Sequence, residues 1–488
     1  MPAWIVVLLV TLGYLALSLA VGLLSGRRAS SGTEGYVAGD RNLGFLVMYF
    51  VMGASIFSAF AFLGGPGWAY SRGAAAFYIL AYGTIGLVPW YFFGPRVARL
   101  GRRFGYVTQA QLFAHRFESK ALSAALALIA LVAFIPYLVL QIKGAGYVFN
   151  IVTEGRMPVW AGSALAYAVV LIYVFKSGVM GVAWTNTFQG IFMMVLAWGL
   201  GLYLPWKLFG GVGKMFQALA EEVPEMLTAP GLASSGEPWS WGAYSSAIAI
   251  SSIGFSLWPH YFMKIYTAKD IRTLKKTVVF YPTFQIFLIP ILFIGFSGIL
   301  RFPGVVPADA ILPTILMRLE LPAVVIGLFC AGALAASMST GDAILHAAGS
   351  VVIKDFYCVL FRPDMSDAAQ TFWIRAMVLV IGAVSYYLAV ATDVSLVLLL
   401  LLSYGFLAQI FPVIVTTFFW PRATPQGVLA GLGTGCAVTI LFNLMPALQW
   451  QGIHPGIWGL LVNVPVQVVV SLLTPAMDES HVNQFVVQ

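Results

Sequence analysis

Uninterrupted apolar runs of about 20 residues recur along this chain, and they constrain its fold more than any other feature. A run of this length crosses a bilayer as a helix, because helical hydrogen bonds satisfy every backbone polar group without water. We predict thirteen such spans. They are residues 4–24, 45–64, 74–93, 122–142, 158–175, 184–204, 243–262, 278–300, 323–349, 372–390, 395–418, 427–444 and 456–473.

The composition agrees with a membrane protein. Of the 488 residues, 60% are hydrophobic and only 9% are charged, whereas soluble domains carry about 25% charged residues. Most charges lie in short loops between the apolar runs. We therefore predict an all-α polytopic membrane protein that forms a single transmembrane domain over residues 1–488.

The distribution of Lys and Arg predicts the orientation, because loops rich in these residues stay in the cytoplasm. With the N-terminus outside, 19 of the 26 Lys and Arg residues fall in cytoplasmic loops. This predicts a multi-pass protein of the inner (plasma) membrane with a cytoplasmic C-terminus. The net charge of +8 then follows from topology and indicates no nucleic-acid partner.

Two of the predicted spans contain residues that weaken helices. Residues 53–70 read GASIFSAFAFLGGPGWAY, and residues 244–263 read YSSAIAISSIGFSLWPHYFM. In either segment alone, small residues are explained by close helix packing. The two segments lie five spans apart, however, and transporters place their sites at broken helices in corresponding halves. We predict two inverted five-helix repeats, residues 45–204 and 243–418, preceded by the helix 4–24 and followed by two helices in 427–473.

Span 323–349 carries adjacent hydroxyls at Ser339 and Thr340. The carbonyl oxygen of Ala336 lies beside them on a helix, since a carbonyl points toward residues three and four positions later. Three oxygens in one patch suit a hard cation, and an unwound helix could supply the others. Sodium is the expected ion. The alternative is that both hydroxyls bond back to their own helix.

Two charged residues near or within spans allow two interpretations each. Asp342 is the only carboxylate well inside a predicted span, and it either assists cation release or bonds a neighbouring helix. Lys143 ends the fourth predicted span, where it either extends to water or binds substrate together with Tyr137 and Gln141. Motifs for metal hydrolases and nucleotide-driven pumps do not occur, so we do not expect an enzyme.

The segment Lys207 to Ser240 is the longest polar stretch. It predicts an amphipathic helix that lies on the outer face of the bundle, either as a lid or as a plain connector.

The chain resembles the sodium:solute symporter family over nearly its whole length. The resemblance rests on five motifs. These are GASIFSAFAFLGGPGWAY, GVAWTNTFQG from Gly181, LWPHYFMKIYTAKD from Leu257, ASMSTGDAILHAAGSVVIKDFY from Ala336 and FWPRATPQGVLAGLGTG from Phe419. It implies a LeuT-like core of two inverted five-helix repeats and symport driven by the sodium gradient.

The resemblance also implies positions for the site residues. The sodium ligands would be the carbonyls of Ala54, Phe57 and Ala336 and the hydroxyls of Ser339 and Thr340. Substrate would lie beside this site, between the two interrupted spans. The candidate substrate residues are Ser58, Ser256 and Trp258, with Tyr137 and Gln141 from the fourth span.

Two positions depart from relatives in the family. Asn186 stands where many relatives have Asp, and a neutral amide cannot supply the charge that a second sodium ion would favour, so we predict one coupled cation. Ile56 stands where proline carriers have an acid, which argues against proline as substrate.

The stretch PHYFMKIYTAKD resembles the branch that carries acetate and other short monocarboxylates, with pantothenate carriers close by. An anion also suits the helix N-termini exposed at a break. We predict a sodium-coupled importer of a small organic anion, most simply a monocarboxylate, that works by alternating access as a monomer in the bilayer. The alternatives are an importer of a neutral solute or amino acid, and a membrane sensor with a transporter fold.

Overall fold

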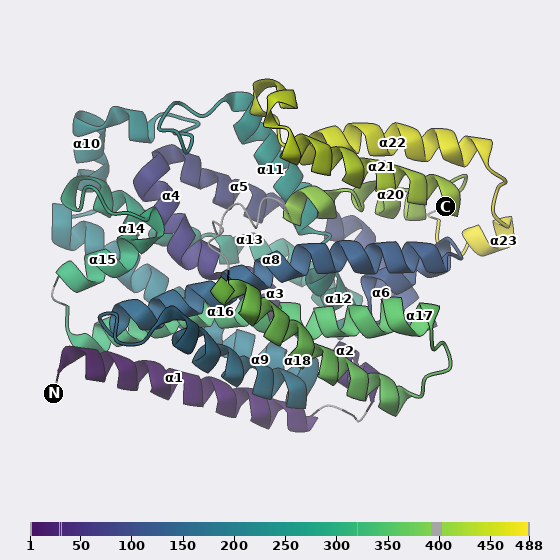
Figure 1. The fold of residues 1–488 in the computed structure, drawn as a ribbon, viewed down its shortest axis with the longest axis horizontal. Helices are drawn as coiled ribbons and strands as arrows, with labels where there is room; N and C mark the ends of the chain where they lie inside the picture. Colours follow the sequence, from purple (N-terminus) through teal and green to yellow (C-terminus); the bar gives the residue numbers. More distant parts are fainter. Residues whose placement is uncertain (1, 29, 31, 320, 392–402, 487–488) are drawn as a thin grey trace.

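The computed structural model describes residues 2–28, 30, 32–319, 321–391 and 403–486. These residues form a bundle of helices that run mainly along the long axis of the molecule (Figure 1). Strand pairing within them is limited to two isolated bridges, Leu43 with Ala268 and Leu232 with Pro238. The predicted all-α class is confirmed.

The helices follow the apolar runs of the sequence. Those of the first half are α1 (Ala3–Ser25), α2 (Thr33–Ala38), α3 (Phe45–Ala54), α4 (Gly65–Arg72), α5 (Phe77–Ile85), α6 (Val88–Phe104), α7 (Gln109–Arg116), α8 (Lys120–Val152), α9 (Val159–Phe209) and α10 (Val212–Glu222). Those of the second half are α11 (Trp241–Phe255), α12 (Pro259–Thr267), α13 (Ile271–Gln285), α14 (Leu288–Arg301), α15 (Ile311–Arg318), α16 (Ala323–Val351), α17 (Cys358–Leu360), α18 (Asp367–Ala391), α20 (Phe411–Phe419), α21 (Pro425–Leu444), α22 (Pro455–Leu473) and α23 (Glu479–Val482).

Both segments with helix-weakening residues are broken helices. After α3 ends at Ala54, the chain is unwound through Ser58, and a wide helical turn, η3 (Phe60–Gly64), then leads into α4. After α11 ends at Phe255, helical structure resumes with α12 at Pro259. Proline is well placed there, because the first residue of a helix needs no N–H partner.

The predicted count of thirteen spans is not confirmed. Nine helical segments in the described part of the chain are long and apolar enough to cross a bilayer. Helix α9 covers two predicted spans, 158–175 and 184–204, which run together through a kink at Gly178. The broken helices are too short to qualify singly, and the predicted span 395–418 begins outside the described residues.

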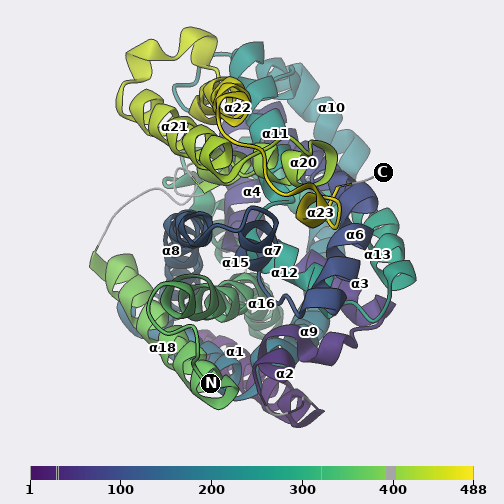
Figure 2. The same ribbon diagram turned by 90° about the vertical axis from the view of Figure 1, so that its right-hand side faces the viewer.

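Helix α16 lies near the centre of the bundle. It packs against α1, α8, α9 and α18. Helices α21 and α22 pair with each other on the side of the molecule opposite α1 and α18 (Figure 2). Nearly all of its residues from Ile326 onward are buried. This position places Ser339 and Thr340 in the interior.

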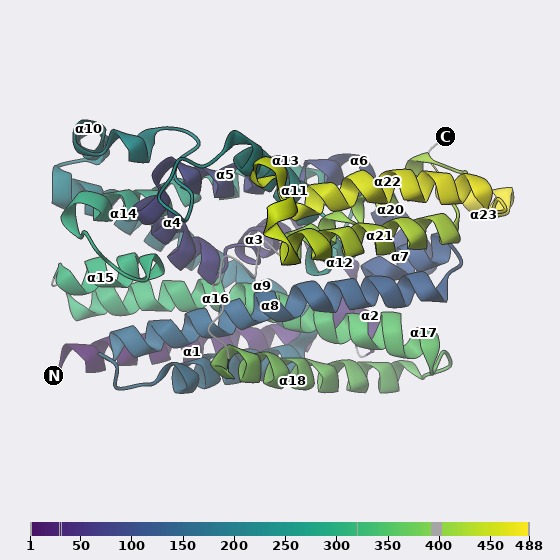
Figure 3. The same ribbon diagram turned by 45° about the horizontal axis from the view of Figure 1, so that its top comes forward.

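Helix α10 lies at the end of the bundle where the chain begins (Figure 3). It packs on α9 and α14, and it buries Met215 and Leu219 while its charged residues stay exposed. The amphipathic helix expected in this connection is therefore present.

The helix of the fourth predicted span extends beyond the predicted end of that span. Helix α8 continues past Lys143 to Val152, because the residues that follow are again small or apolar. Lys143 is only 5% exposed. Its side chain therefore does not extend to water from a helix end.

Candidate functional site

The first break lies directly against the middle of α16. The hydroxyl oxygen of Ser339 lies 2.9 Å from the carbonyl oxygen of Ala54 and 3.2 Å from that of Ala336, so its single proton is shared between the two. Ala54 is the last residue of α3, where the helix no longer pairs its carbonyls. The structure thus brings three of the five predicted sodium ligands together.

The other two predicted ligands are also buried in this region. Thr340 is fully buried, and its hydroxyl oxygen forms no hydrogen bond of normal geometry among the described residues, although the Tyr137 phenol is directed toward it. Phe57 lies in the unwound stretch, and its ring packs against Phe284 and Phe287 at centroid distances of 5.0 and 3.9 Å. An unpaired buried oxygen is costly without a partner, so the donor set fits a small hard cation.

Asn186 connects the break to α16 from the side of α9. Its amide nitrogen donates to the Ser55 hydroxyl at 2.8 Å and to the carbonyl oxygen of Ser339 at 3.1 Å. The sequence indicated that this residue is neutral. It did not indicate that the amide would act as a donor to the residues around the predicted cation position.

Two predicted substrate residues stabilise the end of the first break. The side-chain oxygen of Gln141 accepts a hydrogen bond from the Ala59 amide at 2.9 Å, and the Ser58 hydroxyl oxygen accepts one from the Phe60 amide at 3.2 Å. The carbonyl of Gln141 also accepts from the Ser337 hydroxyl at 2.6 Å. These contacts satisfy amides that the start of a helix leaves unpaired.

The remaining predicted substrate residues gather near the second break. The rings of Tyr137 and Trp258 lie 4.9 Å apart, and the phenol of Tyr137 is directed toward Ser58 and Thr340. The carbonyl of Ser256 accepts from the indole nitrogen of Trp90 at 2.9 Å, and the Ser256 hydroxyl donates to its own helix. Ser256 therefore has partners within the protein.

The sequence did not predict a series of aromatic rings that leads to Trp258. Tyr404 packs on Trp258 at 5.8 Å, Tyr82 on Tyr404 at 5.6 Å, Tyr78 on Tyr82 at 4.8 Å and Trp68 on Tyr78 at 5.8 Å. We call these rings, together with Tyr137, the aromatic column. The spacing of four residues between Tyr78 and Tyr82 was the available signal, since it places both on one helix face.

All five predicted substrate residues are buried, with exposed fractions of 3% or less. A cavity next to the first break, lined by Phe57, Tyr82, Phe255 and Gln285 among others, has room for about one water molecule. A solute bound between the two breaks would therefore require the helices to move apart.

Asp342 bonds a neighbouring helix. One of its carboxylate oxygens accepts from the Tyr173 hydroxyl at 2.7 Å and from the Thr185 hydroxyl at 3.2 Å, both on α9. The other oxygen has no hydrogen-bond partner among the described residues. The buried Lys264 of α12 acts on Asp342 through its charge alone, since the two form no ion pair among the described residues.

Relatives of known name match the chain over most of its length. It is 31% identical to the "Uncharacterized symporter YhjB" of Bacillus subtilis, and the match covers 98% of this chain and 99% of the relative. It is 26% identical to a "Monocarboxylate transport permease protein" of Rhizobium johnstonii, with 90% of each chain covered. It is also 26% identical to the "Sodium/pantothenate symporter" of Escherichia coli, with 94% of each covered.

The fold matches a solved transporter. A structure described as the substrate-bound outward-open state of a Na⁺-coupled sialic acid symporter superimposes with a TM-score of 0.80 at 20% identity, over 97% of this chain and 99% of that one. The expected LeuT-like fold is confirmed by this similarity.

Most of the chain also matches a family model. The model described as "SSF: Sodium:solute symporter family" matches residues 36–435, which include both breaks and all of α16. The protein is therefore a multi-pass membrane transporter that couples the movement of a small solute to sodium, and not an enzyme. The chain belongs to the sodium:solute symporter family.

Proposed function

We propose that this transporter imports a small organic anion, most simply a monocarboxylate, across the plasma membrane together with sodium. The observation that carries the coupling is the contact between Ser339 on α16 and Ala54 at the end of α3. The anionic substrate is supported by relatives named for monocarboxylates and pantothenate. Both kinds of solute carry one carboxylate.

The proposed sodium ligands are the carbonyls of Ala54, Phe57 and Ala336 and the hydroxyls of Ser339 and Thr340. All five donors are oxygens, the ligands that hard cations prefer. When sodium is bound, the Ser339 proton turns away from the carbonyls that it now contacts. The Thr340 hydroxyl then acquires the partner of good geometry that it lacks within the protein.

Sodium binding and substrate binding are linked through the first break. A cation between α16 and the end of α3 favours the arrangement in which these two elements are close together. Substrate between the breaks would contact the same unwound segment through Ser58, with Ser256, Trp258, Tyr137 and Gln141 around it. When either sodium or substrate binds, it orders the unwound segment, and the other ligand then binds with a smaller loss of conformational entropy.

We propose a stoichiometry of one sodium ion. The amide nitrogen of Asn186 donates to Ser55 and to the Ser339 carbonyl. A donor at this position uses oxygens that a second cation would need as ligands. The amide therefore satisfies them without an ion.

We further propose that the end of the bundle with α10 and the start of α1 faces outward, that transport proceeds by alternating access between two helix groups, and that one chain is the working unit. The excess of Lys and Arg in the loops at the other end supports this orientation.

The test is uptake by proteoliposomes under an inward gradient of sodium, with choline replacing sodium in the control at constant pH. Labelled acetate, lactate and pantothenate are compared with proline, alanine and glucose. We expect sodium-dependent uptake of at least one carboxylate probe. Sodium-dependent uptake of only the sugar or the amino acids would overturn the anion assignment and favour the neutral solute or amino acid.

A further inference from the structure

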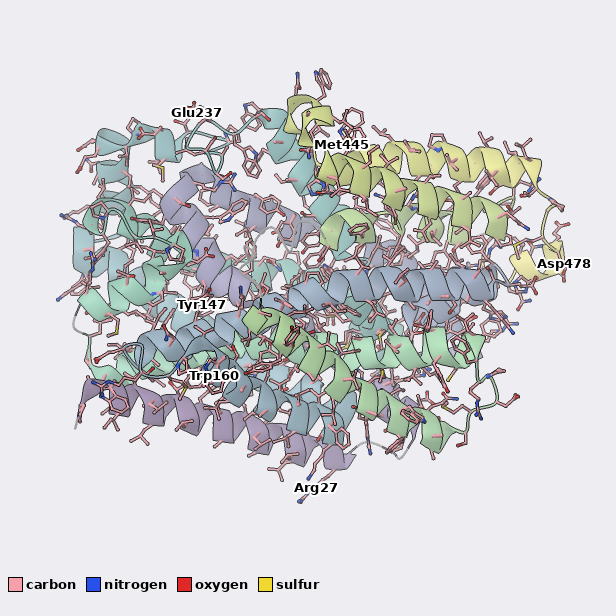
Figure 4. All side chains as sticks on the ribbon, in the orientation of Figure 1. Arg27, Tyr147, Trp160, Glu237, Met445 and Asp478 are labelled. Atoms are coloured by element: carbon pink, nitrogen blue, oxygen red, sulfur yellow. The ribbon has the colours of Figure 1, made fainter. Side chains whose placement is uncertain are left out.

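The connection between α10 and α11 is fastened to the end of α4. The backbone amide of Leu232 donates to the carbonyl of Arg72 at 3.0 Å, and the Arg72 side chain returns a bond from its Nε to the Leu232 carbonyl at 2.7 Å. The backbones approach so closely that a Cβ on Gly73 would lie 2.0 Å from the Met226 oxygen. This loop therefore covers the end of α4. Glu237, labelled in Figure 4, lies on the loop.

The guanidinium of Arg72 lies against two tryptophan rings. Its Cζ atom is 3.9 Å from the ring centre of Trp68 on α4 and 4.5 Å from that of Trp239 on the covering loop. The two rings lie 5.8 Å apart at a steep angle. Contact with two rings limits the rotation of the guanidinium and holds its planar fork of N–H groups in one orientation.

The positive charge of Arg72 has no carboxylate partner within the described chain. Its Nε is occupied by Leu232, and no described acidic side chain forms an ion pair with it. The side chain is only partly exposed. A fixed, half-buried guanidinium with unused N–H groups is suited to a carboxylate, which it can bind through two parallel hydrogen bonds.

The same two tryptophans stand at the start of the aromatic column. Trp68 packs on Tyr78 at 5.8 Å, and Trp239 lies 6.4 Å from the same ring. From there the column continues through Tyr82 and Tyr404 to Trp258 in the second break. Arg72 thus marks the α10 end of a series of rings that reaches the proposed substrate residues.

We propose that Arg72, held against Trp68 and Trp239, is an outer recognition site for the carboxylate of the substrate. The solute contacts this guanidinium before the helices open along the aromatic column. The inference rests on the proposed anionic substrate and on the proposed outward orientation of the α10 end. It identifies the residue that selects for negative charge at that end.

The test compares initial uptake rates of labelled acetate, lactate and pantothenate in cells that express the wild type, Arg72→Gln or Arg72→Lys. We expect Arg72→Gln to raise the KM for a transported carboxylate about tenfold, with Vmax within about twofold, because a charge-assisted pair is lost. Arg72→Lys keeps the charge without the planar fork, and its KM should be intermediate. The neutral analogues acetamide, lactamide and pantothenol are added as competitors of the labelled carboxylates. Because they carry no negative charge, they should inhibit uptake by either variant at least as well as they inhibit uptake by the wild type.

A matched control is Arg301→Gln. Arg301 also contacts an aromatic ring, with its Cζ 4.8 Å from the ring centre of Phe209, but it lies outside the aromatic column. The KM of Arg301→Gln for the carboxylate should equal that of the wild type. Trp239→Leu should raise the KM several-fold, and Trp239→Phe, which retains a ring over the guanidinium, should raise it less.

The outcomes separate the two proposals. If the wild type takes up a carboxylate with sodium and Arg72→Gln has an unchanged KM, the recognition site is wrong and the proposed function stands. If Arg72→Gln lowers the Vmax and the melting temperature but leaves the KM unchanged, Arg72 only holds the loop on α4 and does not bind substrate. If the wild type takes up no carboxylate, both proposals are wrong.

Discussion

The Ser339 hydroxyl lies 2.9 Å from the Ala54 carbonyl oxygen, although the two residues are 285 positions apart in the chain. Ala54 ends α3, and Ser339 lies in the middle of the central helix α16. A carbonyl freed at a helix end inside a membrane must find a partner within the protein. Ser339 is that partner in this structure, and sodium would be the additional one during transport.

Replacing Ser339 by Ala should weaken sodium binding. The change removes one proposed ligand and one contact between α16 and the break, and the loss of an interaction with a charged group costs about 1.5–3 kcal/mol. We expect the sodium concentration for half-maximal uptake to rise about tenfold or more. Ser350→Ala is the control, since that hydroxyl bonds only the His346 carbonyl of its own helix at 2.8 Å. Equal sodium dependence in both variants would remove Ser339 from the site.

Replacing Thr340 by Val should stabilise the protein without sodium but weaken its binding of sodium. The buried Thr340 hydroxyl forms no hydrogen bond of normal geometry among the described residues, although the Tyr137 phenol is directed toward it, and an unpaired group of this kind costs about 1–3 kcal/mol. We expect Thr340→Val to raise the melting temperature in choline and to reduce the further increase that sodium produces. A sodium-induced increase as large as that of the wild type would show that Thr340 is not a ligand.

Replacing Asn186 by Asp should change the number of coupled ions. A carboxylate cannot donate to the Ser339 carbonyl as the amide does, but it supplies the charge that a second cation needs. We expect the wild type to show a hyperbolic dependence of uptake on sodium and Asn186→Asp to show a sigmoidal one. Sigmoidal dependence in the wild type would contradict the single-ion proposal.

The interaction of Asp342 with Lys264 should appear in a double-mutant cycle. Both charges are buried without an ion pair between them among the described residues, so their coupling should be smaller than the roughly 3–5 kcal/mol lost when a buried ion pair is broken. We expect Asp342→Asn and Lys264→Met each to lower the melting temperature, and the double variant to be more stable than their separate effects predict. Additive effects would mean that the two charges do not stabilise each other. Uptake by the double variant would show whether the pair is also needed for transport.

Helical structure and the positions of the breaks were predictable from sequence because both depend on local interactions. Apolar runs form helices in a bilayer, and the residues around Ser55 and Pro259 interrupt them at the positions seen in the structure. The count of spans was less predictable. At Gly178 the backbone of α9 leaves helical geometry, so the two spans predicted there from hydropathy meet at a kink and not at a loop.

The candidate site was predictable only in part. The hydroxyls of Ser339 and Thr340 beside the Ala336 carbonyl follow from helix periodicity. The role of Gln141 was not predictable, because its bond to the Ala59 amide depends on how α8 packs against the first break. The same holds for Lys143, whose burial results from packing around a helix that continues beyond it.

The sequence by itself determined that this protein is a helical membrane transporter, that two of its helices are broken, and that the proposed oxygen ligands of α16 lie together on one turn. These properties depend on hydropathy and on residues a few positions apart. Only the tertiary structure decided that Ala54 meets Ser339, that the Asn186 amide donates to Ser55 and to the Ser339 carbonyl, and that Arg72 lies against Trp68 and Trp239. Such contacts join distant segments, and their geometry depends on the packing of whole helices rather than on any local pattern.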